Sequence, residues 1–383
     1  MQKPAVNEPR IDPEEILEGI RRWVEVETPS HDGVAVNKLN DIVEAEFVAL
    51  GAKVERVPGR DGFGDVVIAR SPWGGDGPGI LVLSHLDTVH PHGSIDTPEL
   101  KWRREGDSVF GPGIYDMKAG AHMAFYAYRH LLRLNEQSQL PITFCFVPEE
   151  EVGSPTSRAT IERLARNAKH VLVTEPARDG GKIVTSRKGV GRFVIKARGR
   201  PAHAGVRHQD GRSAIREIAH QILAVEGMTN YDRGITTNVG LITGGTGVNV
   251  VPQECTAEVD LRVPDPTIAE EMCARIGALT ARDPDVQLKV EGGMNRPPYT
   301  KDAGIAALFD HAKALAAEVG FDLQDVPLTG GGSDGNFTAA LGVPTLDGLG
   351  ADGKGAHTDY EQIYFSSLEP RTRLWVKLFE TLK

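Results

Sequence analysis

The sequence predicts an α/β protein with a mainly parallel sheet and helices on both of its faces, interrupted by an inserted α+β domain of ferredoxin-like type. Three observations support this. Short apolar, β-rich runs alternate with amphipathic helical segments in the first half of the chain. From about Val190 the pattern becomes a compact β-α-β-β-α-β series, and the first pattern then returns. An insertion that splits one larger domain explains this order better than two tandem domains.

The first domain is expected to open with a helix at Pro13, because Glu14 and Glu15 suit its first turn and apolar residues recur at helical spacing. A second helix is expected at 34–50. Four strands and one intervening helix follow in chain order. They are strands 65–70 and 79–89, helix 117–134, and strands 142–150 and 170–176.

The insertion is predicted to span residues 189–297, leaving 1–188 and 298–383 as one discontinuous larger domain. Its strands are expected at 191–200, 236–245, 255–264 and 286–293, and its helices at 213–225 and 268–280. A helix at 304–319 then resumes the first domain. Such a sheet leaves an edge strand open to pairing, and proteins seldom leave such an edge bare. We therefore expect a homodimer formed through this domain.

Composition excludes several classes of protein. The 383 residues carry a formal net charge of −10, which argues against nucleic acid or an anionic membrane as a partner. Cys145, Cys255 and Cys273 are scattered without a C-x-x-C pair, so neither a disulfide framework nor a thiolate zinc cluster is expected. The N-terminal segment lacks the apolar core of a signal peptide, and no apolar run approaches the roughly 20 residues of a membrane span. A cytoplasmic location is predicted.

The segment SHLDTVHP places His85 and Asp87 just past an apolar strand. Residues i and i+2 of an extended segment share a face, so Asp87 is positioned to hold the imidazole of His85 and raise its basicity toward a metal. A surface His–Asp pair without function is the alternative.

The segment GPGIYDMKAG superficially imitates a dinucleotide-binding motif. Asp116 replaces its third glycine and puts a negative charge where a pyrophosphate would lie, which excludes nucleotide binding and suits a cation. The alternative is a helix-capping aspartate.

Further carboxylates follow apolar strands. Glu149, Glu150 and Glu151 form an acidic run in PEEEVGS, and Glu175 follows another strand. His357 lies two residues before Asp359 in GAHTDYEQI. Acidic runs are usually solvated, but the carboxyl edge of a parallel sheet is where ligands bind. Imidazole and carboxylate without thiolate suit catalytic zinc, cobalt or manganese.

Taken in order, these motifs resemble those of the di-zinc metallopeptidases and deacylases related to bacterial glutamate carboxypeptidase, acetylornithine deacetylase and succinyl-diaminopimelate desuccinylase. The resemblance covers essentially the whole chain, including the insertion, and implies a catalytic domain of the zinc-peptidase type. The residues that carry it are His85, Asp87, Asp116, Glu150, Glu151, Glu175 and His357.

The resemblance implies two Zn²⁺ ions per subunit, with Co²⁺ or Mn²⁺ as possible substitutes. Asp116 would bridge both ions, His85 and Glu175 would complete one site, and Glu151 and His357 the other. Glu150 would be the general base, because the family pattern of two acids, any residue and Gly-Ser fits only with Glu150 as its first acid.

The resemblance also implies roles in the insertion. His203 in GRPAHAG would reach the neighbouring subunit's site and stabilise an oxyanion, while Asn249 and Arg262 would grip a substrate carboxylate. The glycine-rich loop around Gly332 would line the substrate site. Alternatives are that His203 ends a strand and that Arg262 pairs with Asp260 or Glu258 on the sheet.

The resemblance favours cleavage of an amide or peptide bond next to a free C-terminal amino acid, as in glutamate carboxypeptidases. The substrate would be a small N-acyl amino acid or dipeptide-like molecule. An N-acyl amino acid deacylase is the alternative within the same chemistry. A non-catalytic amino-acid- or metal-binding relative is the alternative from another class, and such a relative would be expected to have lost its base or its ligands.

Overall fold

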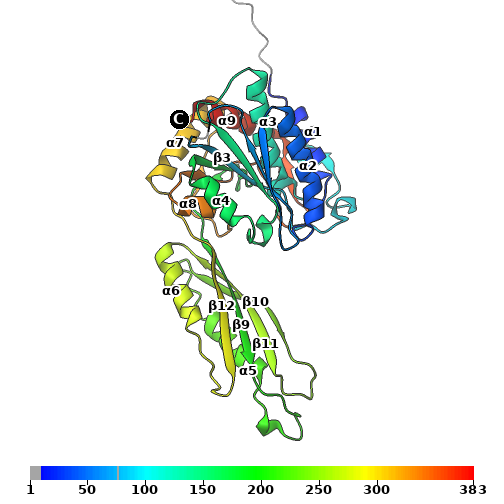
Figure 1. Cartoon of the computed structure of the whole chain (residues 1–383), viewed down its shortest axis with the longest axis vertical. Coiled ribbons are helices and arrows are strands. Elements are labelled where there is room, and N and C mark those ends of the chain that lie inside the picture. The colour runs from blue at the N-terminus through cyan, green and yellow to red at the C-terminus, as the bar shows by residue number, and fades with distance from the viewer. Residues whose placement is uncertain (1–9, 76) are drawn as a thin grey trace, which may run out of the picture. The chain divides into compact units, whose positions relative to one another are not determined.

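The computed structural model describes residues 10–75 and 77–383 (Figure 1). Part of the N-terminal segment used to predict the absence of a signal peptide therefore lies outside the described residues. The chain forms two compact units. Unit 1 comprises Met1–Thr185, Lys301–Pro327 and Ser333–Lys383, and unit 2 comprises Ser186–Thr300 and Leu328–Gly332.

Unit 1 is built on a sheet with the strand order β1-β2-β6-β3-β7-β14. The neighbours β6, β3, β7 and β14 are parallel, whereas β1 and β2 add an antiparallel margin. The mainly parallel α/β prediction is confirmed. The strands are β1 (Lys53–Val57), β2 (Val66–Arg70), β3 (Gly79–His85), β6 (Ile142–Val147), β7 (Ala168–Val173) and β14 (Thr345–Leu346).

Helices cover both faces of this sheet, as β3 demonstrates (Figure 1). Ile80 and Val82 of β3 belong to one apolar cluster, and Leu81 and Leu83 belong to another on the opposite face. The first cluster receives α1 (Pro13–Val24), α2 (Gly33–Ala49), α3 (Ala119–Arg133), α7 (Ala303–Glu318) and α9 (Leu368–Thr381). The second receives α4 (Arg158–Ala165) and α8 (Gly335–Ala340).

A second, four-stranded sheet in unit 1 has no counterpart in the sequence prediction. Its order is β15 (Gly353–Lys354), β16 (Gln362–Tyr364), β5 (Ser108–Phe110) and β4 (Arg103–Glu105). The strands are too short to leave a periodic signal. They bring the segment before Asp116 beside the segment after His357. A parallel pair, β8 (Ile183–Val184) with β13 (Asp325–Val326), completes the unit's strands in the described part of the chain.

Unit 2 has the strand order β10-β11-β9-β12 with all neighbours antiparallel, and its two helices share one apolar cluster on one face of the sheet (Figure 1). This is the predicted ferredoxin-like arrangement. Its elements are β9 (Gly189–Arg198), α5 (Ala214–Glu226), β10 (Thr236–Gly244), β11 (Glu254–Val263), α6 (Pro266–Gly277) and β12 (Gln287–Arg296).

Unit 2 is slightly wider than 189–297 and includes a segment distant in sequence, Leu328–Gly332. The backbone explains this inclusion, because Thr329 accepts from the Lys188 N–H at 2.9 Å and donates to the Ser186 carbonyl at 3.2 Å. Arg187, fully buried, donates to the Gly331 carbonyl at 3.0 Å. Within residues 10–75 and 77–383, no helix combines the length and apolar character that crossing a bilayer requires.

Candidate metal centre

Three of the predicted ligand segments meet at one edge of the sheet in unit 1. His85 is the last residue of β3, Glu175 follows β7, and Glu150 opens a short 3-10 turn (Glu150–Val152) after β6. Strands β6, β3 and β7 are parallel neighbours. Their carboxyl ends therefore coincide, and the side chains that follow them converge.

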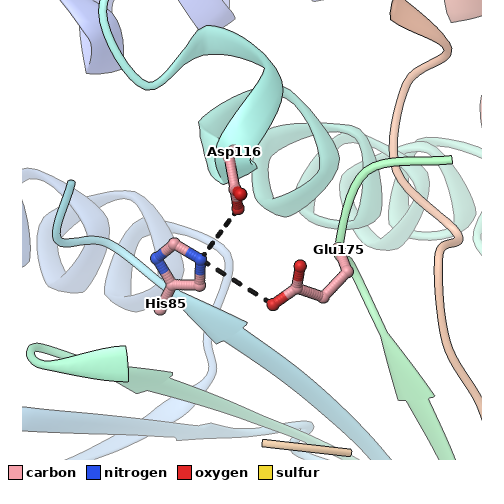
Figure 2. A group of neighbouring side chains, drawn as sticks. All are labelled: His85, Asp116 and Glu175. Atoms are coloured by element: carbon pink, nitrogen blue, oxygen red, sulfur yellow. Dashed lines mark hydrogen bonds and ion pairs between the residues drawn. The ribbon is translucent and has the colours of Figure 1, made fainter. Parts of the chain in front are cut away.

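The first group of side chains comprises His85, Asp116 and Glu175 (Figure 2). His85 Nε2 lies 3.1 Å from Asp116 Oδ1 and 3.8 Å from Glu175 Oε1. His85 and Glu175 are buried, at 2% and 5% exposure. One imidazole nitrogen and two carboxylates thus face a common point.

The second group comprises Asp116, Glu151 and His357. His357 Nε2 lies 2.9 Å from Glu151 Oε2 and 3.4 Å from Asp116 Oδ2. Asp116 therefore turns one oxygen toward each histidine and is shared by the two groups. His357 has a left-handed backbone, with φ of 63°, and a half-exposed side chain, so this side of the centre is the more open one.

The electrostatics of both groups favour a cation. Burial alone would lower the pKa of His85, but hydrogen bonds to Asp116 and Asp87 and nearby negative charges raise this pKa well above its usual value. Hydrogen bonds to Asp116 and Glu151 raise the pKa of His357 to about 11. The field that holds protons on these imidazoles also attracts a divalent ion.

The donor set fits such an ion. Burial raises the pKa of Glu151 to about 8, and its Oε1 is buried without a hydrogen-bond partner among the described residues. Burying a carboxylate oxygen without a hydrogen-bond partner costs folding free energy unless a cation compensates for it. Imidazole nitrogens and carboxylate oxygens, without thiolate, suit zinc, cobalt or manganese.

Asp87 has a wider role than the sequence indicated. His85 Nδ1 lies 3.0 Å from the Asp87 main-chain oxygen and 3.5 Å from its carboxylate. A carbonyl only accepts, so Nδ1 carries the hydrogen and Nε2 is left for a metal. The Asp87 carboxylate instead accepts the N–H groups of Glu150, at 3.0 Å, and Glu151, at 3.2 Å, and the Ser30 hydroxyl at 2.6 Å. Asp87 thus fixes His85 and the acidic turn together.

The three acids of this turn differ in their surroundings. Glu149 is fully buried and accepts the N–H groups of Thr156 and Ser157 near the start of α4, at 2.9 and 2.7 Å. Glu151 belongs to the second ligand group. Glu150, at 8% exposure, lies close enough to both groups that its charge raises the pKa of His85 and of Glu151.

Glu361 is a residue of the site that the sequence analysis missed. It is fully buried and accepts the N–H groups of Gly113, Tyr115 and Asp116, the turn that presents Asp116. Asp359, the acid that the His-x-Asp motif indicated, is exposed. An acid two residues before the apolar run Ile363-Tyr364-Phe365 was the available signal, and it is a weak one.

The three candidates from the insertion and Gly332 of the glycine-rich loop all lie in unit 2. His203 pairs with Val250 in a β-bridge, and the Asn249 carbonyl accepts the Ala204 N–H at 2.9 Å, so His203 and Asn249 lie in adjoining segments. At Gly332, an added Cβ would lie 2.8 Å from Val190 Cγ2, so the close packing of this loop requires glycine.

Arg262 adopts the pairing that the sequence analysis had left open. Its Nε and Nη2 donate to the two oxygens of Asp260 at 2.7 and 2.9 Å, and its Nη1 donates to the Gly330 carbonyl at 3.1 Å. Its guanidinium is therefore engaged by its own sheet and by the glycine-rich loop.

The chain is similar to known proteins over most of its length. Residues 81–381 match the sequence profile of Peptidase family M20/M25/M40. The chain is 28% identical to carboxypeptidase G2 of Pseudomonas sp. over 363 residues, covering 93% of this chain and 86% of that protein.

Two solved structures share the fold. The aminopeptidase PepT of Bacillus cereus superposes with a TM-score of 0.75 at 25% identity, covering 96% of this chain and 98% of that one. An M20 family metallo-carboxypeptidase of Sulfolobus solfataricus superposes with a TM-score of 0.73 at 18% identity, covering 96% and 99% of the two chains.

Proposed function

Because the chain belongs to peptidase family M20/M25/M40 and is a metal-dependent hydrolase, we propose that it hydrolyses the amide or peptide bond next to a free C-terminal amino acid, using two metal ions. The motif resemblance is thereby confirmed at the level of the family. The observation that carries the proposal is the shared carboxylate, since Asp116 offers one oxygen to His85 and the other to His357.

In this proposal Zn²⁺ would be the resident ion. His85 and Glu175 would hold one ion, Glu151 and His357 would hold the other, and Asp116 would contribute to both. Two bound divalent ions would supply Lewis acidity toward the scissile carbonyl and would lower the pKa of the attacking water. Three protein ligands for each ion leave room for substrate.

Glu150 is proposed as the general base. It lies beside both ligand groups, where a carboxylate would take a proton from the attacking water and pass it to the departing amine. Asp87 supports this arrangement by holding both elements. Its carboxylate accepts the backbone N–H groups of Glu150 and Glu151, and its carbonyl orients the imidazole of His85.

A substrate panel tests the proposed reaction. Metal-loaded protein is offered N-acyl amino acids and dipeptides with a free C-terminal carboxylate, each beside its C-terminal amide. We expect kcat/KM to fall by roughly 10- to 100-fold on amidation, as for the loss of hydrogen bonds to a charged group worth about 1.5–3 kcal/mol. Equal cleavage of both forms would contradict recognition of the carboxylate. Cleavage confined to peptides with a free N-terminus would indicate an aminopeptidase.

We also propose a homodimer formed through unit 2. Strand β10 lies at the end of its sheet, and Leu241 and Ile242 on it are 62% and 53% exposed. A two-fold partner would cover this edge in both copies. His203 would then serve the partner's centre as an oxyanion donor, a contribution of about 3–4 kcal/mol in comparable enzymes.

A mixing experiment tests the shared site. The inactive variants His203→Ala and Glu150→Gln are combined and allowed to exchange subunits. If sites are shared, a heterodimer has one site with both lesions and one with neither, so activity partly returns. No return of activity despite proven exchange, or an active monomer, would contradict this arrangement.

A further inference from the structure

We propose that Glu361 is a positioning residue for the shared ligand Asp116, and that it ties together the three chain segments that carry His85, Asp116 and His357. This inference rests on the proposed metal centre and assigns a residue that none of the motifs singled out.

The Glu361 carboxylate is saturated with donors. Oε1 accepts the N–H groups of Tyr115 at 2.8 Å and Asp116 at 2.9 Å. Oε2 accepts the Gly113 N–H at 3.0 Å and lies 2.5 Å from His90 Nε2. Each oxygen thus serves two donors, which compensates for the burial of a fully enclosed carboxylate.

These contacts determine where Asp116 points. The turn around it is irregular, with Asp116 at φ −115° and ψ 92°, so helical hydrogen bonds do not define its direction. Glu361 instead holds the backbone of Asp116 and of its neighbours on the N-terminal side. With the main chain fixed, the two Asp116 oxygens are aimed at His85 and His357, at 3.1 and 3.4 Å.

The same carboxylate joins distant segments. Glu361 lies four residues after His357 and directly before β16, which pairs with β5. His90 lies five residues after His85. The segments of three ligands therefore converge on Glu361, and a loosened Glu361 should affect both metal sites rather than one.

A carboxylate is required here, and an amide of the same shape is a poor substitute. Glutamine has one accepting oxygen. Its NH₂ group would face the N–H groups of Tyr115 and Asp116 in one orientation and that of Gly113 in the other. Glu361→Gln in the full chain is therefore the informative variant. Glu217→Gln is its matched control, because Glu217 is a buried carboxylate that accepts the N–H groups of Arg282 and Asp283 in unit 2, which contributes no residue to either ligand group.

The readout is metal binding, measured by competition with a chromophoric chelator and by the visible spectrum of the Co²⁺-loaded protein. We expect Glu361→Gln to weaken both sites by about 10- to 100-fold, as is typical for partners of metal ligands, and to alter the Co²⁺ spectrum. Glu217→Gln should lower the unfolding temperature and leave both readouts unchanged.

If Glu361→Gln does not fold, Glu361→Asp keeps the charge, cannot reach all four donors, and should give an intermediate loss. A folded variant of either kind with wild-type affinity and spectrum would overturn the inference. Wild-type protein that binds no metal at all would instead overturn the proposed function.

Discussion

The candidate metal centre in unit 1 and the substrate-binding candidates in unit 2 differ in how far a single chain builds them. In unit 1, His85 and Glu175 are buried, and Asp116 and Glu151 are partly buried. The Asp87 carboxylate holds the backbone of Glu151, and the Glu361 carboxylate holds that of Asp116. In unit 2, His203 is exposed and Arg262 is engaged by Asp260. The candidate metal centre therefore has its geometry before any ligand binds. Arg262 in unit 2 would first have to release Asp260 in order to bind a ligand.

This difference separates chemistry from recognition. Charged groups that are already in position need no rearrangement during the reaction, so a preorganised site suits the step in which bonds break. A recognition arginine can remain paired until a substrate carboxylate replaces its partner, which costs affinity but favours the correct ligand. Metal removal, single substitutions and a change of pH can each test whether the two regions differ in this way.

Metal removal should have the largest effect. Chelation is expected to abolish activity, and added zinc or cobalt to restore it. Metal should also stabilise unit 1 selectively, by about 2.7 kcal/mol at a free concentration 100-fold above Kd. Amide hydrogen exchange with and without metal measures this stabilisation. Metal should slow exchange in β3 and leave the exchange rate in β9 unchanged. Equal protection of both strands would show that the units respond as one body.

The two adjacent glutamates should separate catalysis from binding. Glu150→Gln removes the proposed proton acceptor at constant size, and kcat should fall by roughly 10²- to 10⁴-fold with normal metal content. Glu151→Gln should reduce metal content instead. Metal analysis beside steady-state kinetics decides between them, and the reverse pattern would shift the assignment by one residue.

The Arg262–Asp260 pair tests the recognition side. If Arg262 must leave Asp260 to bind substrate, Asp260→Asn should lower KM several-fold with little change in kcat, because a hydrogen bond to a neutral group is weaker than one to a charged group. Arg262→Ala should raise KM for substrates with a free carboxylate and not for their amides. An unchanged KM in Asp260→Asn, with unit 2 intact, would mean that this pair only braces the sheet.

Acid should weaken unit 1 more than unit 2, and this is the smallest expected effect. Burial lowers the pKa of His122 in α3 to about 3, whereas His203, His208 and His220 in unit 2 are not buried. The folded protein keeps His122 neutral while the unfolded chain protonates it, so this contribution is complete above about pH 6.5 and is lost as the pH falls toward 3.

His122→Leu should remove this dependence, which amounts to about 1.4 kcal/mol per pH unit. Denaturant unfolding of wild type and variant between pH 7 and 4 measures the difference in slope. Parallel pH dependences would mean that other groups cause the acid sensitivity of unit 1.

The fold was largely predictable because its signals are strong. The alternation of apolar residues in 191–200 and the apolar run of 79–89 are long enough to define strands, and both confirmed strands lie there. The small sheet β15-β16-β5-β4 was not predicted, because strands of two or three residues are too short to show an alternating pattern of apolar residues. The antiparallel strand β1 escaped because Lys53, Glu55 and Arg56 break its apolar character.

The ligand candidates were predictable because each follows a strand or sits in a recognisable motif. Two features were not. The capping of Glu150 and Glu151 by Asp87 depends on the register of parallel strands, and the contact of Glu361 with the Asp116 turn spans 245 residues. Neither leaves a local pattern, because tertiary structure alone brings these groups together.

The number of metal ions bound by Asp116→Ala tests the central claim most directly. Wild-type and variant chains are dialysed against the same zinc buffer, and metal is measured per chain by mass spectrometry, with His85→Ala alongside. The shared carboxylate predicts two ions in the wild type, loss of both in Asp116→Ala and loss of mainly one in His85→Ala. Two ions retained in a folded Asp116→Ala would contradict a centre built around this residue.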